Sequence, residues 1–192
     1  MPRRSILSAA ERASLLLPPD TEDELIRHYA FGETDLSLIR QRRGDANRLG
    51  VAVQLCLLRF PGQGLLPDAS MPMSLLQWIG RQLRIDPSCW PQYAEREETR
   101  REHLLELRAY LGVEPFGLAH YRQAVHATTE LALQTDKGIV LAVNVLDTLR
   151  HRHIIIPALD VIERVCAEAI TRANRRIYEA LSESLADTHR RR

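Results

Sequence analysis

The sequence predicts an all-α protein: two small helix-turn-helix-like modules followed by a long C-terminal helix. Apolar residues recur at spacings of three and four along most of the chain, as on one face of a helix. The alternation of apolar and polar residues that is typical of strands is nearly absent. A length of 192 residues allows one domain or two small ones with buried cores.

The composition is that of a folded protein without a membrane partner. Apolar residues make up 45% of the chain, yet it contains no run of about 18 apolar residues that could span a bilayer. The N-terminal segment contains acidic side chains and a proline pair, which do not fit a signal peptide. We therefore expect a cytoplasmic protein.

The cysteines and the basic residues are informative mainly by their type and placement. The three cysteines lie far apart in the sequence, so they indicate neither a disulfide framework nor a zinc knuckle. Among the 26 basic residues, only Lys137 is a lysine. A GC-rich genome explains this bias, but arginine also offers a planar fork that fits phosphates and guanine edges. Composition alone does not choose between these explanations.

Four helices are expected in the first sixty residues, and each is preceded by a side chain that can cap it. The capping residues are Ser8, Thr21, Thr34 and Asp45. Glutamate follows the first two of them at the spacing of a capping box, and Pro18 with Pro19 stops the first helix. The fourth helix, from residue 46 to about 60, is apolar almost all round except at Gln54, so we expect it to be buried.

Two loops are expected after this fourth helix. Residues 61–73 are rich in proline and glycine, and residues 86–92 also contain two prolines. The segment between these loops returns to helical spacing. The two modules are accordingly expected to span residues 1–85 and residues 93–192.

Four helices are expected in the second module. They cover residues 93–111, 117–134 and 138–153, and the last begins at Pro157. The first of them is charged with a leucine stripe, and the third is apolar enough to be central. The last keeps its apolar spacing through residue 181 and extends over roughly 42 Å. Nothing after that point closes it, so we expect the chain to be cut from a longer one.

The segment "RQRRGDANRLG", residues 40–50, places four arginines around a Gly-Asp pair. Gly44 supplies backbone freedom for a turn, and the carboxylate of Asp45 can cap the next helix at the positive end of its dipole. A cell-adhesion role for the Arg-Gly-Asp tripeptide is not expected, because the chain has no export signal. A basic helix end, a tight break and a second helix is the layout of a helix-turn-helix motif.

The first turn of the helix after this break can contact DNA. Asn47 can pair with adenine and Arg48 with guanine or phosphate, whereas Arg42 and Arg43 suit the phosphate backbone. Since the rest of the helix is apolar, base reading would be confined to its tip. A solvated basic collar without DNA contact is the alternative.

Three long segments, at residues 42–62, 93–112 and 150–181, resemble the N-terminal region of transposases of the Tn-three family. They span nearly the whole chain in the order of the family. The resemblance implies a large parent protein, a DDE-type transposase of replicative transposons, whose N-terminal helical modules bind the terminal inverted repeats of double-stranded DNA. It also implies a homo-oligomeric full-length protein in the bacterial cytoplasm, associated with the nucleoid when it is bound.

The catalytic region that the family implies is RNase-H-like and uses Mg²⁺, and it is expected to lie outside these 192 residues. We therefore expect no enzyme activity, catalytic residue, cofactor or metal ligand in this chain. Motifs of nucleophile-elbow hydrolases, P-loop proteins and HExxH metalloproteases are absent from the sequence. His151 and His153 have the spacing of a metal pair, but no further ligand lies near them in sequence.

The resemblance extends the candidate DNA contacts to two further segments. In the second segment, spacings of three and four align most of the candidates on one helix face that could follow a phosphate backbone, although neighbouring glutamates could pair with the arginines instead. The arginines of the third segment could equally meet the missing part of the transposase. The candidate DNA-binding residues are Arg42, Arg43, Asn47, Arg48, Tyr93, Arg96, Thr99, Arg100, His103, Arg150, Arg152, Arg172, Arg175 and Arg176.

A second function class fits the sequence as well. The formal net charge is only +1, which is low for a domain that holds DNA by itself. A helical protein–protein interaction or oligomerisation module, without specific DNA binding, is therefore the alternative function.

Overall fold

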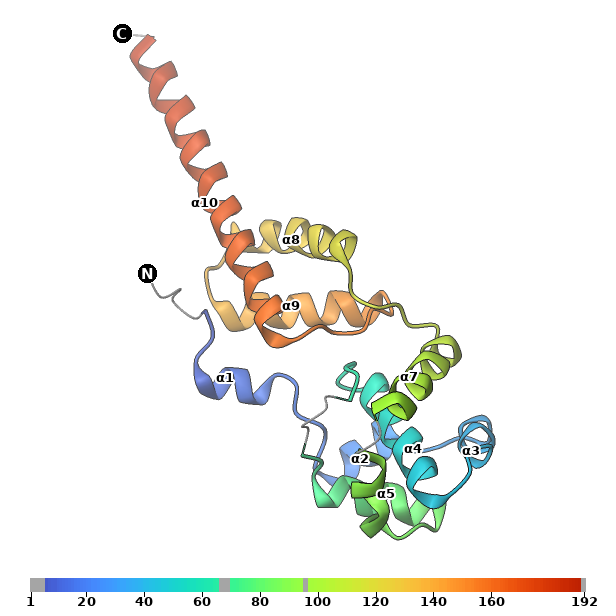
Figure 1. The fold of residues 1–192 in the computed structure, drawn as a ribbon. Coiled ribbons are helices and arrows are strands. Elements are labelled where there is room, and N and C mark those ends of the chain that lie inside the picture. The colour runs from blue at the N-terminus through green and yellow to red at the C-terminus, as the bar shows by residue number, and fades with distance from the viewer. Residues whose placement is uncertain (1–5, 66–69, 95–96, 191–192) are drawn as a thin grey trace. The chain divides into compact units, whose positions relative to one another are not determined.

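The structure, a computed structural model, describes residues 6–65, 70–94 and 97–190. Every regular element within those residues is a helix, which confirms the predicted all-α class (Figure 1). The helices form two compact units. One unit comprises Leu17–Glu114, and the other comprises Met1–Leu16 together with Pro115–Arg192.

These units differ in their bounds from the predicted modules 1–85 and 93–192. Helix α7 (Glu97–Leu111) packs against α4 (Asp45–Arg59), so it belongs to the unit that precedes it in the chain. Leu7, just ahead of α1 (Ala9–Ser14), is part of the hydrophobic core of the other unit. The boundary is set by which apolar faces pack together, and a pattern along the chain does not show those partners.

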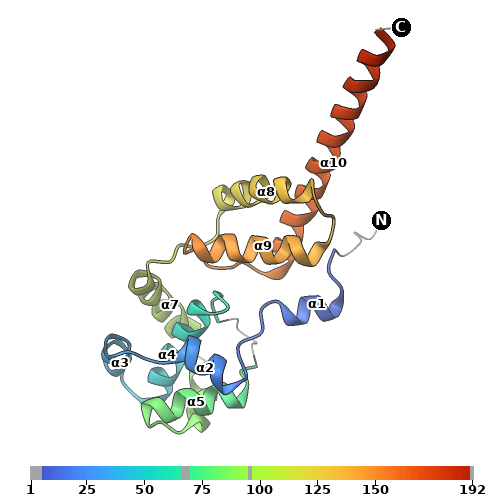
Figure 2. The ribbon, with the colours of Figure 1, turned by 180° about the vertical axis from the view of Figure 1, so that it is seen from behind.

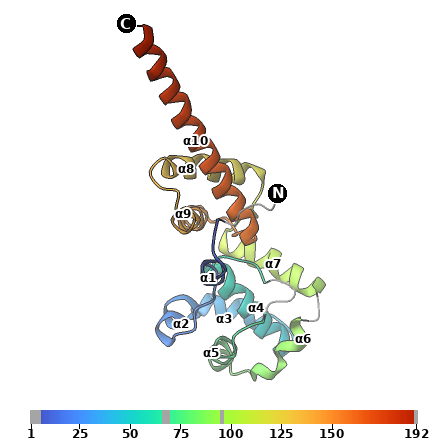
Figure 3. The same cartoon turned by 90° about the vertical axis from the view of Figure 1, so that its left-hand side faces the viewer.

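Helix α4 lies at the centre of the Leu17–Glu114 unit, as the view in Figure 3 shows. Its ten residues Leu49–Leu58 are all buried, which confirms the prediction made from its apolar surface. It contacts every other helix of this unit. Those helices are α2 (Glu22–Tyr29), α3 (Glu33–Arg40), α5 (Met73–Leu83), the 3₁₀ helix η1 (Pro87–Cys89), α6 (Trp90–Ala94) and α7.

The helix starts follow the predicted caps in part. Ser8 forms the expected capping box, because its side chain accepts from the Glu11 N–H and the Glu11 carboxylate accepts from the Ser8 N–H at 2.7 Å. The Thr21 hydroxyl donates to the carboxylate of Glu24 and does not cap the backbone of α2. Thr34 does not cap α3, since that helix begins at Glu33, where Gly32 is the N-cap residue.

Two other local predictions are wrong. Asp45 is the first residue of α4, and the N-cap residue is Gly44, whose φ of 80° lies in the region that favours glycine. Residues 86–92 are largely helical, because Asp86 caps the 3₁₀ helix η1 and α6 follows directly. Of the charged helix expected over residues 93–111, Tyr93 belongs to α6, and Glu97–Leu111 form α7.

The other unit is built on α8 (Leu118–Ala132), α9 (Gly138–His151) and α10 (Leu159–Arg190). Figure 2 shows α8 and α9 side by side, with α10 crossing them and continuing beyond. Most apolar side chains of α9 lie in the core of this unit, as its composition predicts, whereas Val140 and Val143 are exposed. The stripe on α10 is buried as far as Ala173, whereas Ile177 and Leu181 are 41% and 54% exposed.

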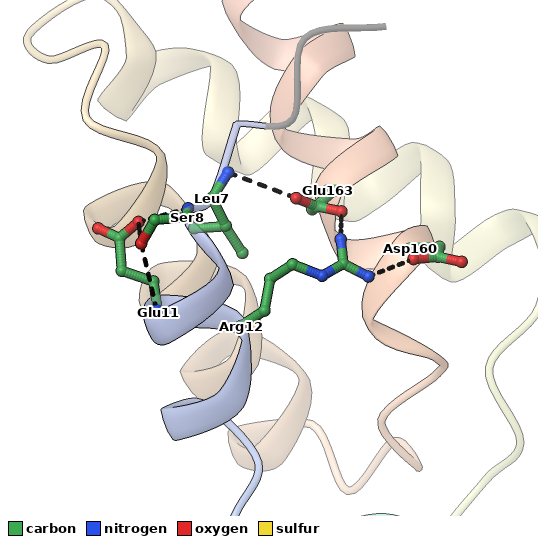
Figure 4. Close-up of polar contacts among 6 residues, drawn as sticks. All are labelled: Leu7, Ser8, Glu11, Arg12, Asp160 and Glu163. Carbon is green, nitrogen blue, oxygen red and sulfur yellow. Dashed lines mark hydrogen bonds and ion pairs between the residues drawn. The ribbon is translucent and has the colours of Figure 1, made fainter. Parts of the chain in front are cut away.

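The segment around α1 is joined to α9 and α10 by polar contacts and close packing (Figure 4). Arg12 donates to Asp160 at 2.6 Å and also pairs with Glu163, which accepts from the backbone N–H of Leu7. Any side chain at Gly138 would collide with the backbone of Ile6, because a Cβ atom there would lie 2.4 Å from the Ile6 carbonyl oxygen. The N-terminal segment therefore belongs structurally to the unit formed by α8, α9 and α10.

Asp35 joins three parts of the Leu17–Glu114 unit through one buried carboxylate. It accepts from Arg59 at 2.6 Å, from the Tyr110 hydroxyl at 2.7 Å and from the Gly32 N–H at 2.9 Å. Burial raises the pKa of Asp35, but these donors outweigh burial and hold its pKa below the ordinary value. The carboxylate is thus ionised in the fold and links α3, α4 and α7.

We predict that Asp35→Ala lowers the free energy of unfolding by about 2 kcal/mol, because three donors lose a charged acceptor. The lowered pKa means that this contribution is complete at neutral pH and is lost as the pH falls below about 4. Urea unfolding of both proteins should therefore show a difference at neutral pH that shrinks in acid. The control Glu97→Ala removes an exposed pair with Arg101 and should change stability by less than about 0.5 kcal/mol.

Candidate nucleic-acid interface

The turn between α3 and α4 is held closed by the side chains that follow it. The Asn47 amide donates to the carbonyl of Arg43 at 3.0 Å, and the Arg48 Nε donates to the carbonyl of Arg42 at 3.0 Å. Arg48 also lies 3.6 Å from Asp45. Both Asn47 and Arg48 remain partly exposed. Two predicted base-reading residues therefore shape this turn and still reach the surface.

Arg42 and Arg43, the two residues expected at the phosphate backbone, lie in different surroundings. The Arg42 guanidinium turns onto α7 and pairs with both carboxylate oxygens of Glu106, at 2.6 and 3.2 Å, so that only 18% of its side chain is exposed. The Arg43 side chain is exposed, and its guanidinium pairs with no described residue. Arg42 therefore joins the turn to α7, and Arg43 is left available to an anion.

Two residues predicted as DNA contacts, Tyr93 and His103, are buried. The Tyr93 side chain is fully enclosed, and its ring packs so closely on α4 that a Cβ atom on Gly50 would lie 2.2 Å from it. Its hydroxyl accepts from the Gln54 amide and lies 3.2 Å from Nδ1 of His103. In this fold the Tyr93 hydroxyl joins Gln54 and His103 inside the core, so neither Tyr93 nor His103 is placed at the surface where a DNA contact was expected.

The protonation states of this buried group fit its hydrogen bonds. Burial, followed by the nearby charge of Arg42, lowers the pKa of His103. Burial raises the pKa of Tyr93 to about 12. A neutral imidazole can accept the Tyr93 proton at Nδ1, so the chain from Gln54 through Tyr93 to His103 is complete without a charge. This group offers no cation to a phosphate.

The remaining candidates of the second segment are partly at the surface. Thr99 and Arg100 are half-buried near the start of α7, and the carbonyl of Arg100 accepts from the amide of Gln54 at 3.0 Å. Arg96 lies outside the described residues. Gln54, the polar residue in the apolar stretch of α4, was the sequence signal for this arrangement. A buried amide needs polar partners, so Gln54 indicated that polar side chains from elsewhere would turn into the core.

The five arginines of the third segment that were selected as candidates lie in the unit that contains α8, α9 and α10, and each has a partner. Arg152 donates to Gln123 at 2.7 Å, and the others pair with carboxylates. These ion pairs are Arg150–Asp147, Arg172–Glu168, Arg175–Glu179 and Arg176–Glu130. Exposed pairs of this kind contribute at most about 1 kcal/mol, so a phosphate can replace the carboxylate at little cost.

Two arginines that the sequence analysis did not select are exposed beside the first turn of α4. Arg40 ends α3, and Arg84 is the C-cap residue of α5. Neither side chain has a partner among the residues that the structure describes. Arg40 stands in the basic stretch that drew attention to the turn, but nothing in the sequence around Arg84 shows that α5 ends near that turn.

No helix in the described part of the chain is both long and apolar enough to cross a membrane. Within residues 6–65, 70–94 and 97–190, no three histidine, cysteine, aspartate or glutamate side chains gather closely enough to hold a metal ion.

Comparison with known proteins places the chain in a family. Residues 6–169 match the family described as "Domain of unknown function (DUF4158)". The chain belongs to this family. It is also 62% identical over 192 residues to the transposase of transposon Tn3926 from Escherichia coli, and 58% identical over 190 residues to that of Tn501 from Pseudomonas aeruginosa. A more distant relative, the transposase of Tn1546 from Enterococcus faecium, is 34% identical over 184 residues.

These matches cover 96 to 100% of the chain but only 19% of each relative. They confirm the resemblance to the N-terminal region of Tn-three-family transposases. The DUF4158 match covers most of both compact units, since it begins before α1 and ends within α10.

We predict that Tyr93→Phe lowers the free energy of unfolding by about 1 to 3 kcal/mol, because Gln54 and His103 both lose the hydroxyl between them. The affinity for duplex DNA should not change, since Tyr93 is buried. Urea unfolding and fluorescence anisotropy measure the two quantities. Tyr178→Phe, at a tyrosine that is 70% exposed, is the matched control and should alter neither. If Tyr93→Phe instead weakened DNA binding without lowering stability, the result would support the DNA contact expected at Tyr93.

Proposed function

We propose that this chain binds the terminal inverted-repeat DNA of a transposon, as the N-terminal part of a transposase for replicative transposition. The catalytic steps would then belong to a DDE-type region outside the aligned fifth of the relatives. The observation that carries this proposal is the tip of α4, where Arg43, Asn47 and Arg48 reach the surface while the rest of the helix is buried.

The chemistry of this tip suits a duplex. Asn47 uses one amide hydrogen on the carbonyl of Arg43, which leaves its oxygen and its second hydrogen for the edge of an adenine. The side chain of Arg43 has no partner among the described residues and can meet a neighbouring phosphate. The N-terminus of α4 adds the positive end of a helix dipole, which favours an approaching anion.

A contact limited to one helix tip reads few base pairs. The buried length of α4 cannot lie along a groove, because that would remove it from α5, α6 and α7. Specific binding of a terminal repeat therefore needs further contacts, and the exposed arginines of the other unit can supply them after exchanging their carboxylate partners. The net charge of +1 fits local rather than general attraction to DNA.

Self-association through α10 is a second candidate function. The apolar stripe of this helix continues past Ala173 with Ile177 and Leu181, which are exposed. A stripe at such spacing fits the same stripe on a second copy of this chain. This candidate predicts that the mass measured by sedimentation rises with protein concentration. Self-association alone predicts no preference for one DNA duplex over another.

We predict that the chain binds a duplex carrying its transposon end in preference to a scrambled duplex of equal length. Affinity should fall steeply as salt rises, because each neutralised phosphate releases counterions. A competition gel shift at several salt concentrations measures both effects. Equal retention of the two duplexes would contradict specific binding, and concentration-dependent self-association in the same samples would then favour the second candidate.

We predict that Asn47→Ala lowers discrimination between correct and mismatched duplexes by about 1 to 3 kcal/mol for the base pair that it reads. Arg43→Gln should instead weaken all duplexes alike, because a phosphate contact carries no sequence information. Binding isotherms on matched and mismatched duplexes separate the two effects. Arg27→Gln is the control, since Arg27 is an exposed arginine on α2 without a partner among the described residues. Uniform weakening by Asn47→Ala would exclude a reading role.

A further inference from the structure

A hollow of ≈ 450 Å³ lies where α3, α4 and α5 meet. Arg40 from the end of α3, Arg48 from the first turn of α4 and Arg84 from the end of α5 all line it. Ile39 and Leu83 contribute apolar walls. Three guanidinium groups from three helices thus surround one space.

The charge around this hollow is not balanced by the protein. None of the described residues that line it is acidic. The side chains of Arg40 and Arg84 have no partner in the described part of the chain, and the carboxylate that Arg48 reaches, on Asp45, lies 3.6 Å away. Like charges that share a site repel one another, so an anion in the hollow would relieve that repulsion. Arginine's planar fork also matches the geometry of phosphate oxygens.

The wall of the hollow is held in place by hydrogen bonds. Gln82 lines it and is bonded at both ends of its amide, because it accepts from the N–H of Phe31 and donates to the carbonyl of Tyr29, each at 3.0 Å. The Arg48 Nε donates to the carbonyl of Arg42, which fixes the guanidinium. Its two terminal nitrogens remain available to an anion. The space is therefore prearranged before an anion enters.

Arg84 occupies a backbone position where an arginine is costly. Its φ of 57° and ψ of 45° are left-handed, and helices that end in this way usually carry glycine there. An L side chain at such an angle is strained, and positions of this kind cluster at ligand sites. The backbone turn alone would favour glycine at this position. The arginine is therefore explained by the positive charge that its side chain brings to the hollow.

We propose that Arg40, Arg48 and Arg84 form a phosphate-binding pocket that takes one phosphate of the DNA backbone. This inference rests on the proposed function for the source of the phosphate. The pocket shares Arg48 with the tip of α4, so a phosphate seated in it fixes the register of Asn47 on the neighbouring bases. Anchoring and base reading thereby come from two sides of one helix start.

The test compares Arg40→Gln, Arg84→Gly and the control Arg27→Gln in the full 192-residue chain. Anisotropy with a labelled transposon-end duplex should show about tenfold weaker binding for each pocket variant, and a salt slope lower by about 1. Single phosphates of the duplex can be replaced by neutral methylphosphonates. At one position this replacement should weaken binding by the original chain but leave binding by the pocket variants unchanged. Arg84→Gly should unfold at no lower denaturant concentration, because glycine relieves the strained backbone.

The outcomes separate this pocket from the proposed function. Duplex binding that neither pocket variant alters would overturn the pocket and leave the proposed function standing. Pocket variants that weaken terminal-repeat and scrambled duplexes alike, while the original chain binds both equally, would support the pocket and contradict specific binding. Calorimetric titration with inorganic phosphate adds a third measurement. If phosphate binding needs both Arg40 and Arg84 while the chain binds no duplex, the pocket is a site for free phosphate, and DNA is overturned as the source of the phosphate.

Discussion

Burial of helix α4 on all sides is the constraint on which the Leu17–Glu114 unit depends. Ten consecutive residues are removed from water, so six neighbouring helices must cover them. The one amide within that stretch, on Gln54, needs polar partners and finds them in Tyr93 and Arg100. Gly50 is the point where the Tyr93 ring can approach the helix closely. The stability of this unit and the residues with which α6 and α7 face α4 both follow from the burial of this helix.

The same burial limits how the chain could meet a nucleic acid. Only the first turn of α4 is exposed, so any readout through this helix comes from a few side chains beside a glycine turn. Those side chains also hold the turn together through the carbonyls of Arg42 and Arg43. Structural and recognition roles are therefore combined in Asn47 and Arg48, and a substitution at either one must be judged by stability as well as by binding.

The arginines of this chain fall into two groups that the net charge does not distinguish. Most of those selected from the sequence have carboxylate partners in the fold, as Arg42 has Glu106 and Arg176 has Glu130. Arg40, Arg43 and Arg84 have none among the described residues, and all three lie in one unit, Arg40 and Arg84 at helix ends and Arg43 in the turn before α4. A formal charge of +1 is thus compatible with a concentrated positive site, because acidic side chains neutralise the arginines elsewhere.

The sequence by itself determined most of the helices and the buried state of α4, because apolar periodicity acts within a few residues of the chain. It could not show that Tyr93 and His103 turn inward, since spacing of three and four is the same on a buried face and on an exposed one. Only the tertiary structure placed α7 against α4, paired Arg42 with Glu106 and brought Arg84 beside Arg40 and Arg48. Those outcomes depend on which helix surfaces pack together, and contacts between residues far apart in the chain leave no local pattern.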